Sequence, residues 1–264
     1  MAALPAALIL QRPCLPWRYI AGYGLFTGAG QFGLLYLALS GEISPGLASL
    51  VIQAQVFMTI GLAALIAREQ VRPIQIAALL LSAVGLALIA ALTDNSTTPL
   101  GLVLVLLAAF CWACGNLVVK AAGNVPMLPL VVWGSLFSFP PLAILSAAME
   151  GPSSIVASIT AAPASAWAAL LWQSAANTLF GYAAWNWLLC RHPAALITPM
   201  ALLVPVFGMS ASAILLGEPM PLWKLTAAAL VLAGLVLNFS APIRKAPLPQ
   251  MAKPLRRCGW AISP

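Results

Sequence analysis

Charged residues are scarce in this 264-residue sequence: Asp, Glu, Lys and Arg together make up only 6% of it, whereas 62% of the residues are hydrophobic. The mean hydropathy is +1.01. A soluble domain needs a polar surface, and this composition supplies too few polar residues to cover one. The scarcity of charge therefore excludes an ordinary soluble fold and indicates an integral membrane protein.

Acids are the rarest of the charged residues, with five Asp and Glu in total, and the sequence has one histidine, His192. No acid lies in the middle of an apolar run. An acid embedded in a membrane helix is the usual site of proton coupling, so the sequence assigns coupling to no single residue.

Signatures of enzymes and metal sites are also missing. The sequence contains no GxSxG, HExxH or P-loop motif. Cys111 and Cys114 form a CxxC pair, but they lie inside an apolar helix with no second pair of ligands nearby. We therefore expect no catalytic residues, no metal and no cofactor. A membrane-embedded enzyme, prompted by Lys120, His192 and the CxxC pair, is a weak alternative.

Long apolar runs dominate what is present. Each is near the roughly 20 residues that cross about 30 Å of hydrocarbon as a helix. Strict two-residue alternation is absent from them, which argues against the strands of an outer-membrane barrel. The sequence predicts an all-α polytopic membrane protein with eight spans, at Tyr19–Ser40, Pro45–Ala67, Ile74–Leu92, Leu100–Lys120, Met127–Ala148, Trp167–Leu189, Ala194–Leu216 and Leu222–Ser240.

An internal repeat organises these spans. The passages Pro45 to Leu92 and Ala195 to Ser240 have the same order of features: an apolar helix, a break with a proline and a second apolar helix, which carries Gly85 in one copy and Gly234 in the other. The offset is about 150 residues, which is too long for a solenoid unit and suits half of a duplicated membrane bundle.

The distribution of basic residues predicts that the two copies are inverted. With eight spans, eleven of the twelve Lys and Arg residues fall on one side, and Lys224 is the exception. By the positive-inside rule that side is cytoplasmic. The helix from Pro45 then runs inward and the helix from Ala194 runs outward. We predict a first repeat at 1–98 that is incomplete at its amino end, a second, inverted repeat at 99–241, and a basic, Pro-rich cytoplasmic tail at 242–264.

Five passages of the sequence carry specific motifs. They are GYGL at Gly22, GQF at Gly30, PGLASLVIQAQVFMTIGLAAL at Pro45, AAFCWACGNLVVK at Ala108 and PMALLVPVFGMSASAILLGE at Pro199. In these passages the sequence resembles the EamA family of the drug/metabolite transporter superfamily. The resemblance implies ten helices in two inverted five-helix repeats, a bacterial inner-membrane location, and export of small amino-acid metabolites of the O-acetylserine and cysteine type by alternating access.

Against that pattern, the first helix is missing and the second is reduced to an amino-terminal stub at Met1–Leu10. The departure reflects either a misplaced start codon or a real truncation, and a truncated family member that does not transport is therefore an alternative. The expected partners are a small-molecule substrate and the lipid bilayer. The basic residues form no clustered face, so nucleic acid is not expected. Association into a homodimer stays open.

Uncharged polar residues at membrane depth are the candidate substrate site, because each must find a partner or line a wet cavity. Amides supply both the acceptors and the donors that a zwitterion needs. Gln53 and Gln55 differ by about 200° around a regular helix, so we expect only one of them to face the cavity. Helix-to-helix hydrogen bonding is the alternative role. The candidates are Gln31, Gln53, Gln55, Trp112, Asn116, Trp133, Gln173, Asn177 and Tyr182.

Three charged residues at helix ends complete the candidates. Glu69 and Glu218 end matching helices of the two copies, and Lys120 lies near the cytoplasmic end of its helix. Gating of the transport path is one interpretation. Capping and loop pairing for the acids, and extension of the lysine to the interface, are the structural alternatives, which we favour.

Overall fold

The computed structural model describes residue 7 and residues 9–66, 68–91, 97–123, 125–217 and 220–239, and every regular element in these residues is a helix. The chain forms two compact units, one from residues 1–29, 118–191 and 249–264 and the other from 30–117 and 192–248. Each unit takes segments from both halves of the sequence. The units are defined by packing, so they are a different division from the predicted repeats.

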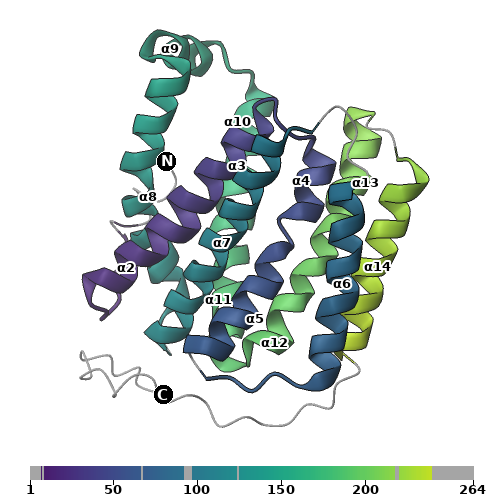
Figure 1. The fold of residues 1–264 in the computed structure, drawn as a ribbon. Coiled ribbons are helices and arrows are strands. Elements are labelled where there is room, and N and C mark those ends of the chain that lie inside the picture. The colour runs from purple at the N-terminus through teal and green to yellow at the C-terminus, as the bar shows by residue number, and fades with distance from the viewer. Residues whose placement is uncertain are drawn as a thin grey trace. The chain divides into compact units, whose positions relative to one another are not determined.

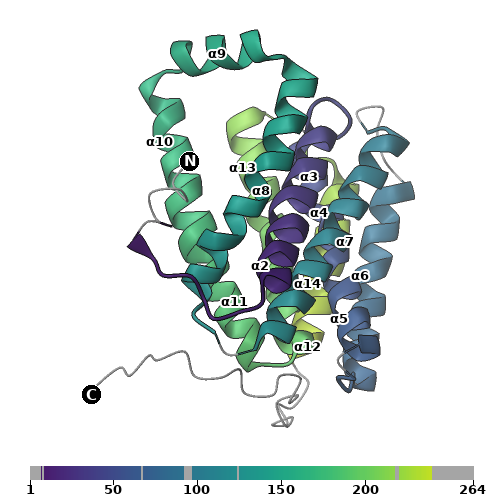
Figure 2. The same ribbon diagram turned by 90° about the vertical axis from the view of Figure 1, so that its left-hand side faces the viewer.

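The first unit is built around α8, against which α2 and α11 pack. The short α9 joins α8 to α10, as Figure 2 shows, and the chain bends by 102° between α9 and the helix that follows. The π-helical segment η2 continues α10 into α11. The elements are α2 (Trp17–Tyr23), α8 (Met127–Glu150), α9 (Pro152–Ala161), α10 (Ala164–Trp172), η2 (Gln173–Gly181) and α11 (Tyr182–Arg191).

Two glycines allow α2 and the π-helical segment η1 (Gly24–Gln31) to lie directly on α8. A Cβ added at Gly24 would lie 2.1 Å from the carbonyl oxygen of Gly134, and one at Gly28 would lie 1.7 Å from Ser138 Oγ. Ser138 Oγ also donates a hydrogen bond of 2.8 Å to the carbonyl of Gly24. The GxxxG sequence from Gly24 to Gly28 therefore serves close packing of helices.

The second unit contains the remaining helices. Ser44 begins α4 by accepting a hydrogen bond from Leu47 N at 3.4 Å, with Pro45 at the first helical position. Gly217 stops α13 in the left-handed conformation, with φ of +65°. The elements are α3 (Phe32–Leu39), α4 (Pro45–Val51), α5 (Ala54–Ile66), α6 (Pro73–Ala91), α7 (Pro99–Ala122), α12 (Ala194–Ile197), η3 (Thr198–Leu203), α13 (Val204–Leu216) and α14 (Leu222–Phe239).

Two interrupted helices cross in this unit. The run α4–α5 is broken between Val51 and Ala54, and the run α12–α13 is broken by the 3₁₀ segment η3. The first half of one run packs on the second half of the other, because α4 contacts α13 and α5 contacts α12 and η3 (Figure 1). The two runs are therefore antiparallel. The helices that follow them, α6 and α14, also pack together.

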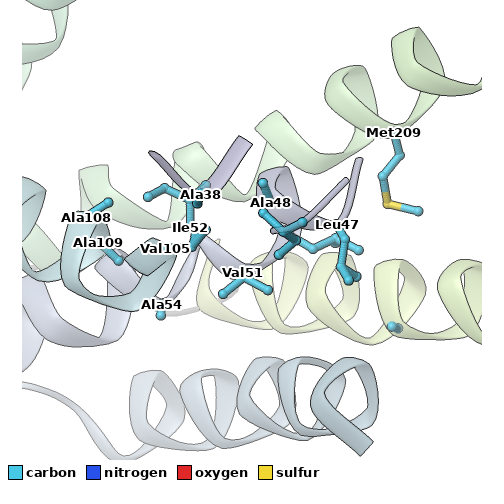
Figure 3. Close-up of a cluster of buried hydrophobic side chains, with 13 residues drawn as sticks. Ala38, Leu47, Ala48, Val51, Ile52, Ala54, Val105, Ala108, Ala109 and Met209 are labelled. Atoms are coloured by element: carbon cyan, nitrogen blue, oxygen red, sulfur yellow. The ribbon is translucent and has the colours of Figure 1, made fainter. Parts of the chain in front are cut away.

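Small side chains form the centre of the second unit (Figure 3). Ala38, Ala108 and Ala109 are completely buried, and they bring α3 and α7 into one cluster with the interrupted run α4–α5. Met209 and Ala227 bring α13 and α14 into the same cluster. This packing holds the break at Ile52 inside protein rather than against lipid.

Three helical runs among the described residues are long and apolar enough to cross a membrane: Pro45–Ile66, which is the interrupted run α4–α5, Pro99–Ala122 and Met127–Glu150. A fourth span results if the bent pair Pro152–Ala161 and Ala164–Arg191 is taken as one. The other predicted spans stay predictions. Of the predicted amino-terminal stub only Ala7 and residues 9–10 are described, and the predicted tail lies outside the described residues.

Candidate functional site

A buried polar cluster joins α5 to α7 in the second unit. Thr59 Oγ1 donates a hydrogen bond of 3.3 Å to Gln55 Oε1. Asn116 Nδ2, from α7, lies 3.4 Å from the same oxygen and 3.2 Å from Thr59 Oγ1. The exposed fractions are 0% for Gln55 and Thr59 and 2% for Asn116. The structure thus brings together two of the predicted site residues, Gln55 and Asn116.

Gln53 lies at the break between α4 and α5. Its Nε2 donates a hydrogen bond of 3.2 Å to the carbonyl of Ser49, in the last turns of α4. The angular argument about Gln53 and Gln55 assumed an unbroken helix, whereas the helix is interrupted at Ile52 and Gln53. Both glutamines are buried, with exposed fractions of 1% and 0%. That only one of them faces the cavity stays a prediction.

Gln31 and Trp112 lie elsewhere in the second unit. Gln31 ends the π-helical segment η1 and has an exposed fraction of 3%. Trp112, on α7, is half-buried and packs against the hydrophobic cluster of Figure 3. Their role at a substrate site stays a prediction.

Trp133 belongs to an aromatic group in the first unit. Its Nε1 donates a hydrogen bond of 3.0 Å to the carbonyl of Leu10. Its ring lies edge-on to Trp17, with the centroids 6.2 Å apart, and the guanidinium of Arg12 lies 3.8 Å from the Trp17 ring centroid. These contacts hold the segment before α2 against α8 and give Trp133 a structural role.

The remaining predicted site residues of the first unit lie on or beside η2. Gln173 and Asn177 are exposed on this π-helical segment, and Tyr182, at the start of α11, is half-buried. Thr178 Oγ1 donates to the carbonyl of Gln173 at 3.1 Å. The segments η1 and η2 start about 150 residues apart, the offset of the sequence repeat. Pi-helical segments are rare and are frequent at functional sites, so the matched pair keeps η2 among the candidates.

The charged residues at helix ends make structural contacts. Glu69 Oε2 accepts a hydrogen bond of 2.9 Å from Ala194 N at the start of α12. Lys120 Nζ donates to the carbonyl of Leu189, near the end of α11, at 3.4 Å. Capping by Glu69 is thereby confirmed, whereas gating stays a prediction. Glu218 lies outside the described residues.

Several polar contacts were missed by the sequence reasoning. Thr59 follows Gln55 at the i+4 position and could have been found from that spacing. The contact of Gln75 Nε2 with the carbonyl of Ala195, at 3.3 Å, joins segments 120 residues apart and leaves no local signal. The same holds for Asn186 Nδ2, which donates to Tyr23 Oη at 3.0 Å. Within the described part of the chain, no three His, Cys, Asp or Glu residues are grouped as metal ligands.

Comparison with known proteins gives one family. The model of the EamA-like transporter family matches residues 1–91 and 99–240. A probable amino-acid metabolite efflux pump of Salmonella typhimurium is 35% identical over 244 residues, which cover 90% of this chain and 82% of that protein. A protein of the same description from Escherichia coli is 32% identical over 253 residues, covering 93% and 85%.

The fold also matches a solved structure. A crystal structure of another protein superposes on this chain with a TM-score of 0.62 and 20% sequence identity, covering 90% of this chain and 83% of that one. At this identity the likeness concerns the fold alone.

Proposed function

Because the chain belongs to the EamA-like transporter family, we propose that it exports small amino-acid metabolites across the bacterial inner membrane. Membership makes it a multi-pass membrane transporter and not an enzyme. Both curated relatives are described as probable amino-acid metabolite efflux pumps and align with at least 90% of this chain. O-acetylserine and cysteine are the substrates that we expect.

The observation that carries the proposal is the crossing of two interrupted, antiparallel helices beside buried amides. Transporters with inverted repeats place their sites near the bilayer midplane, at helices that are interrupted there. The amides of Gln53, Gln55 and Asn116 are uncharged, so they hold no fixed charge in the membrane when the substrate is absent. They still supply hydrogen-bond donors and acceptors to a small polar molecule.

The antiparallel packing also supports two inverted repeats, at residues 1–98 and 99–241. A segment and its copy that run in opposite directions through one unit are what an inverted duplication produces. The two separate family matches, to 1–91 and 99–240, support the same division. Alternating access would then follow from movement of one group of helices against the other around a midplane site.

An efflux assay tests the proposal. The purified full-length chain is reconstituted into proteoliposomes that are loaded with labelled O-acetylserine or cysteine. We expect efflux to exceed that from protein-free liposomes and to fall about tenfold in Gln53→Ala, because a hydrogen bond to a charged group contributes about 1.5–3 kcal/mol.

Gly61→Ala is the matched control, because Gly61 lies on α5, the helix that follows Gln53, and a Cβ there meets nothing within 4 Å. It should transport like the wild type. Efflux no faster than leakage from protein-free liposomes, with the protein shown to be folded, would contradict export of these compounds.

A further inference from the structure

Two neighbouring glutamines at the break each have one end of the amide bound by protein and the other end unbound. Gln55 Oε1 accepts from Thr59 and from Asn116, whereas Gln55 Nε2 has no hydrogen-bond partner among the described residues. Gln53 is the reverse case. Its Nε2 donates to the carbonyl of Ser49, and its Oε1 has no partner within the same part of the chain.

Burial makes these two unbound ends significant. Both side chains are at least 99% buried, and an unsatisfied buried donor or acceptor costs about 1–3 kcal/mol. Gln75 provides the contrast on α6. It is also buried, with an exposed fraction of 9%, but its Oε1 accepts from Arg72 N at 3.0 Å and its Nε2 donates to the carbonyl of Ala195.

The surrounding contacts define which end each amide presents. Asn116 Nδ2 donates to Thr59 Oγ1 as well as to Gln55 Oε1. With Asn116 in that orientation, turning the Gln55 amide by 180° would place two N–H groups against each other. The carbonyl of Ser49 accepts only from a donor, so it requires Nε2 of Gln53 on its side. Gln55 therefore presents N–H donors, and Gln53 presents an acceptor.

We propose that Gln53 and Gln55 form the two ends of a binding site for an α-amino-acid zwitterion. Gln55 Nε2 donates to the carboxylate, and Gln53 Oε1 accepts from the ammonium group. Their Cα atoms are at most two steps of about 3.8 Å apart, which suits a ligand whose two charged groups share one carbon atom. Thr59 and Asn116 are positioning residues, since they act by orienting Gln55. The site rests on the proposed function, because it concerns how the exported metabolite is held.

Three compounds distinguish binding of the ammonium group from binding of the carboxylate. O-acetylserine carries both charges, its methyl ester keeps only the ammonium group, and its N-acetyl derivative keeps only the carboxylate. The measurement is the concentration of each compound that half-maximally raises the unfolding temperature of the purified full-length chain. It reports binding and does not depend on transport. Efflux from proteoliposomes is measured in parallel.

Gln55→Glu keeps the oxygen that faces Thr59 and Asn116 but loses both N–H donors. It should weaken binding of O-acetylserine and of the N-acetyl compound at least about tenfold relative to the wild type, and leave the methyl ester unchanged. Gln53→Met removes the acceptor and should weaken the two compounds that carry an ammonium group. Gln75→Glu is the matched control and should leave the order of the three affinities unchanged.

The outcomes separate the site from the function. Equal effects of Gln55→Glu on all three compounds, the same pattern in Gln75→Glu, or no binding of any compound by the wild type would overturn the zwitterion site. Retention of the expected binding pattern without efflux of O-acetylserine would overturn the proposed function alone. Efflux without that pattern would overturn the site alone.

Discussion

At the scale of single residues, the two interrupted helices begin in different ways. Ser44 caps α4 with its own side chain. The residue before α12 is Pro193, which has no side-chain acceptor, and the carboxylate of Glu69, from the other copy of the repeat, takes that place at 2.9 Å from Ala194 N. A helix start in one copy therefore depends on a residue of the other.

Removing the cap that Glu69 provides should lower the stability of the protein, and a new cap at residue 193 should restore it. We expect Glu69→Ala to lower the free energy of unfolding by about 1 kcal/mol, the usual contribution of a helix cap. Glu69→Gln keeps an acceptor oxygen and should cost less. Pro193→Ser supplies a local cap and should recover most of the loss in the Glu69→Ala background. Thermal unfolding of the four proteins in the same detergent gives these differences, and a full loss that Pro193→Ser does not reduce would contradict the capping role.

A site residue can be predicted from the sequence only where its own type and position indicate its role. Gln55 and Asn116 could be predicted because amides are rare at membrane depth and need partners. The joint burial of Gln53 and Gln55 could not, because the angular argument requires a regular helix and the turn at Ile52 interrupts it. The role of Trp133 was also missed, since its partner Leu10 is 123 residues away.

At the scale of elements, the existence of the helices is readable from apolar run lengths, but their interruptions are not. The π-helical segments η1 and η2 differ from α-helix only in the hydrogen-bond partner of each N–H group. The apolar content of the surrounding run does not show which carbonyl each N–H group uses as its partner. Their matching positions in the two copies indicate that the irregularity belongs to the duplicated element.

Close packing of η1 on α8 predicts the effect of one methyl group. Gly24→Ala places a Cβ 2.1 Å from a backbone oxygen of α8, so the two helices must move apart. We expect the free energy of unfolding to fall by about 1–3 kcal/mol. Gly61→Ala, with open space around the added Cβ, should be neutral or should stabilise by up to about 1 kcal/mol. Unfolding temperatures of the two variants check the contrast, and equal values would contradict the packing.

At the scale of the whole molecule, the two compact units and the two sequence copies divide the chain differently. In the second unit, the run α4–α5 packs on its counterpart α12–α13, and α6 packs on its counterpart α14. The proposed inverted duplication accounts for this antiparallel crossing. It also requires the loops after α5 and after α13 to face opposite sides of the membrane.

That requirement fixes where a fused reporter should appear. The Lys and Arg residues place the loop with Arg68 and Arg72 in the cytoplasm. The next connection, around Asn95, should then lie outside the cytoplasm, and the tail should lie inside. A reporter that is active only outside the cytoplasm should be active when fused after Asn95 and inactive when fused after Lys245, and a cytoplasmic reporter should give the reverse. Activity on the same side for both fusions would mean an even number of spans between them. It would overturn the inverted arrangement, because the two runs would then no longer cross the membrane in opposite directions.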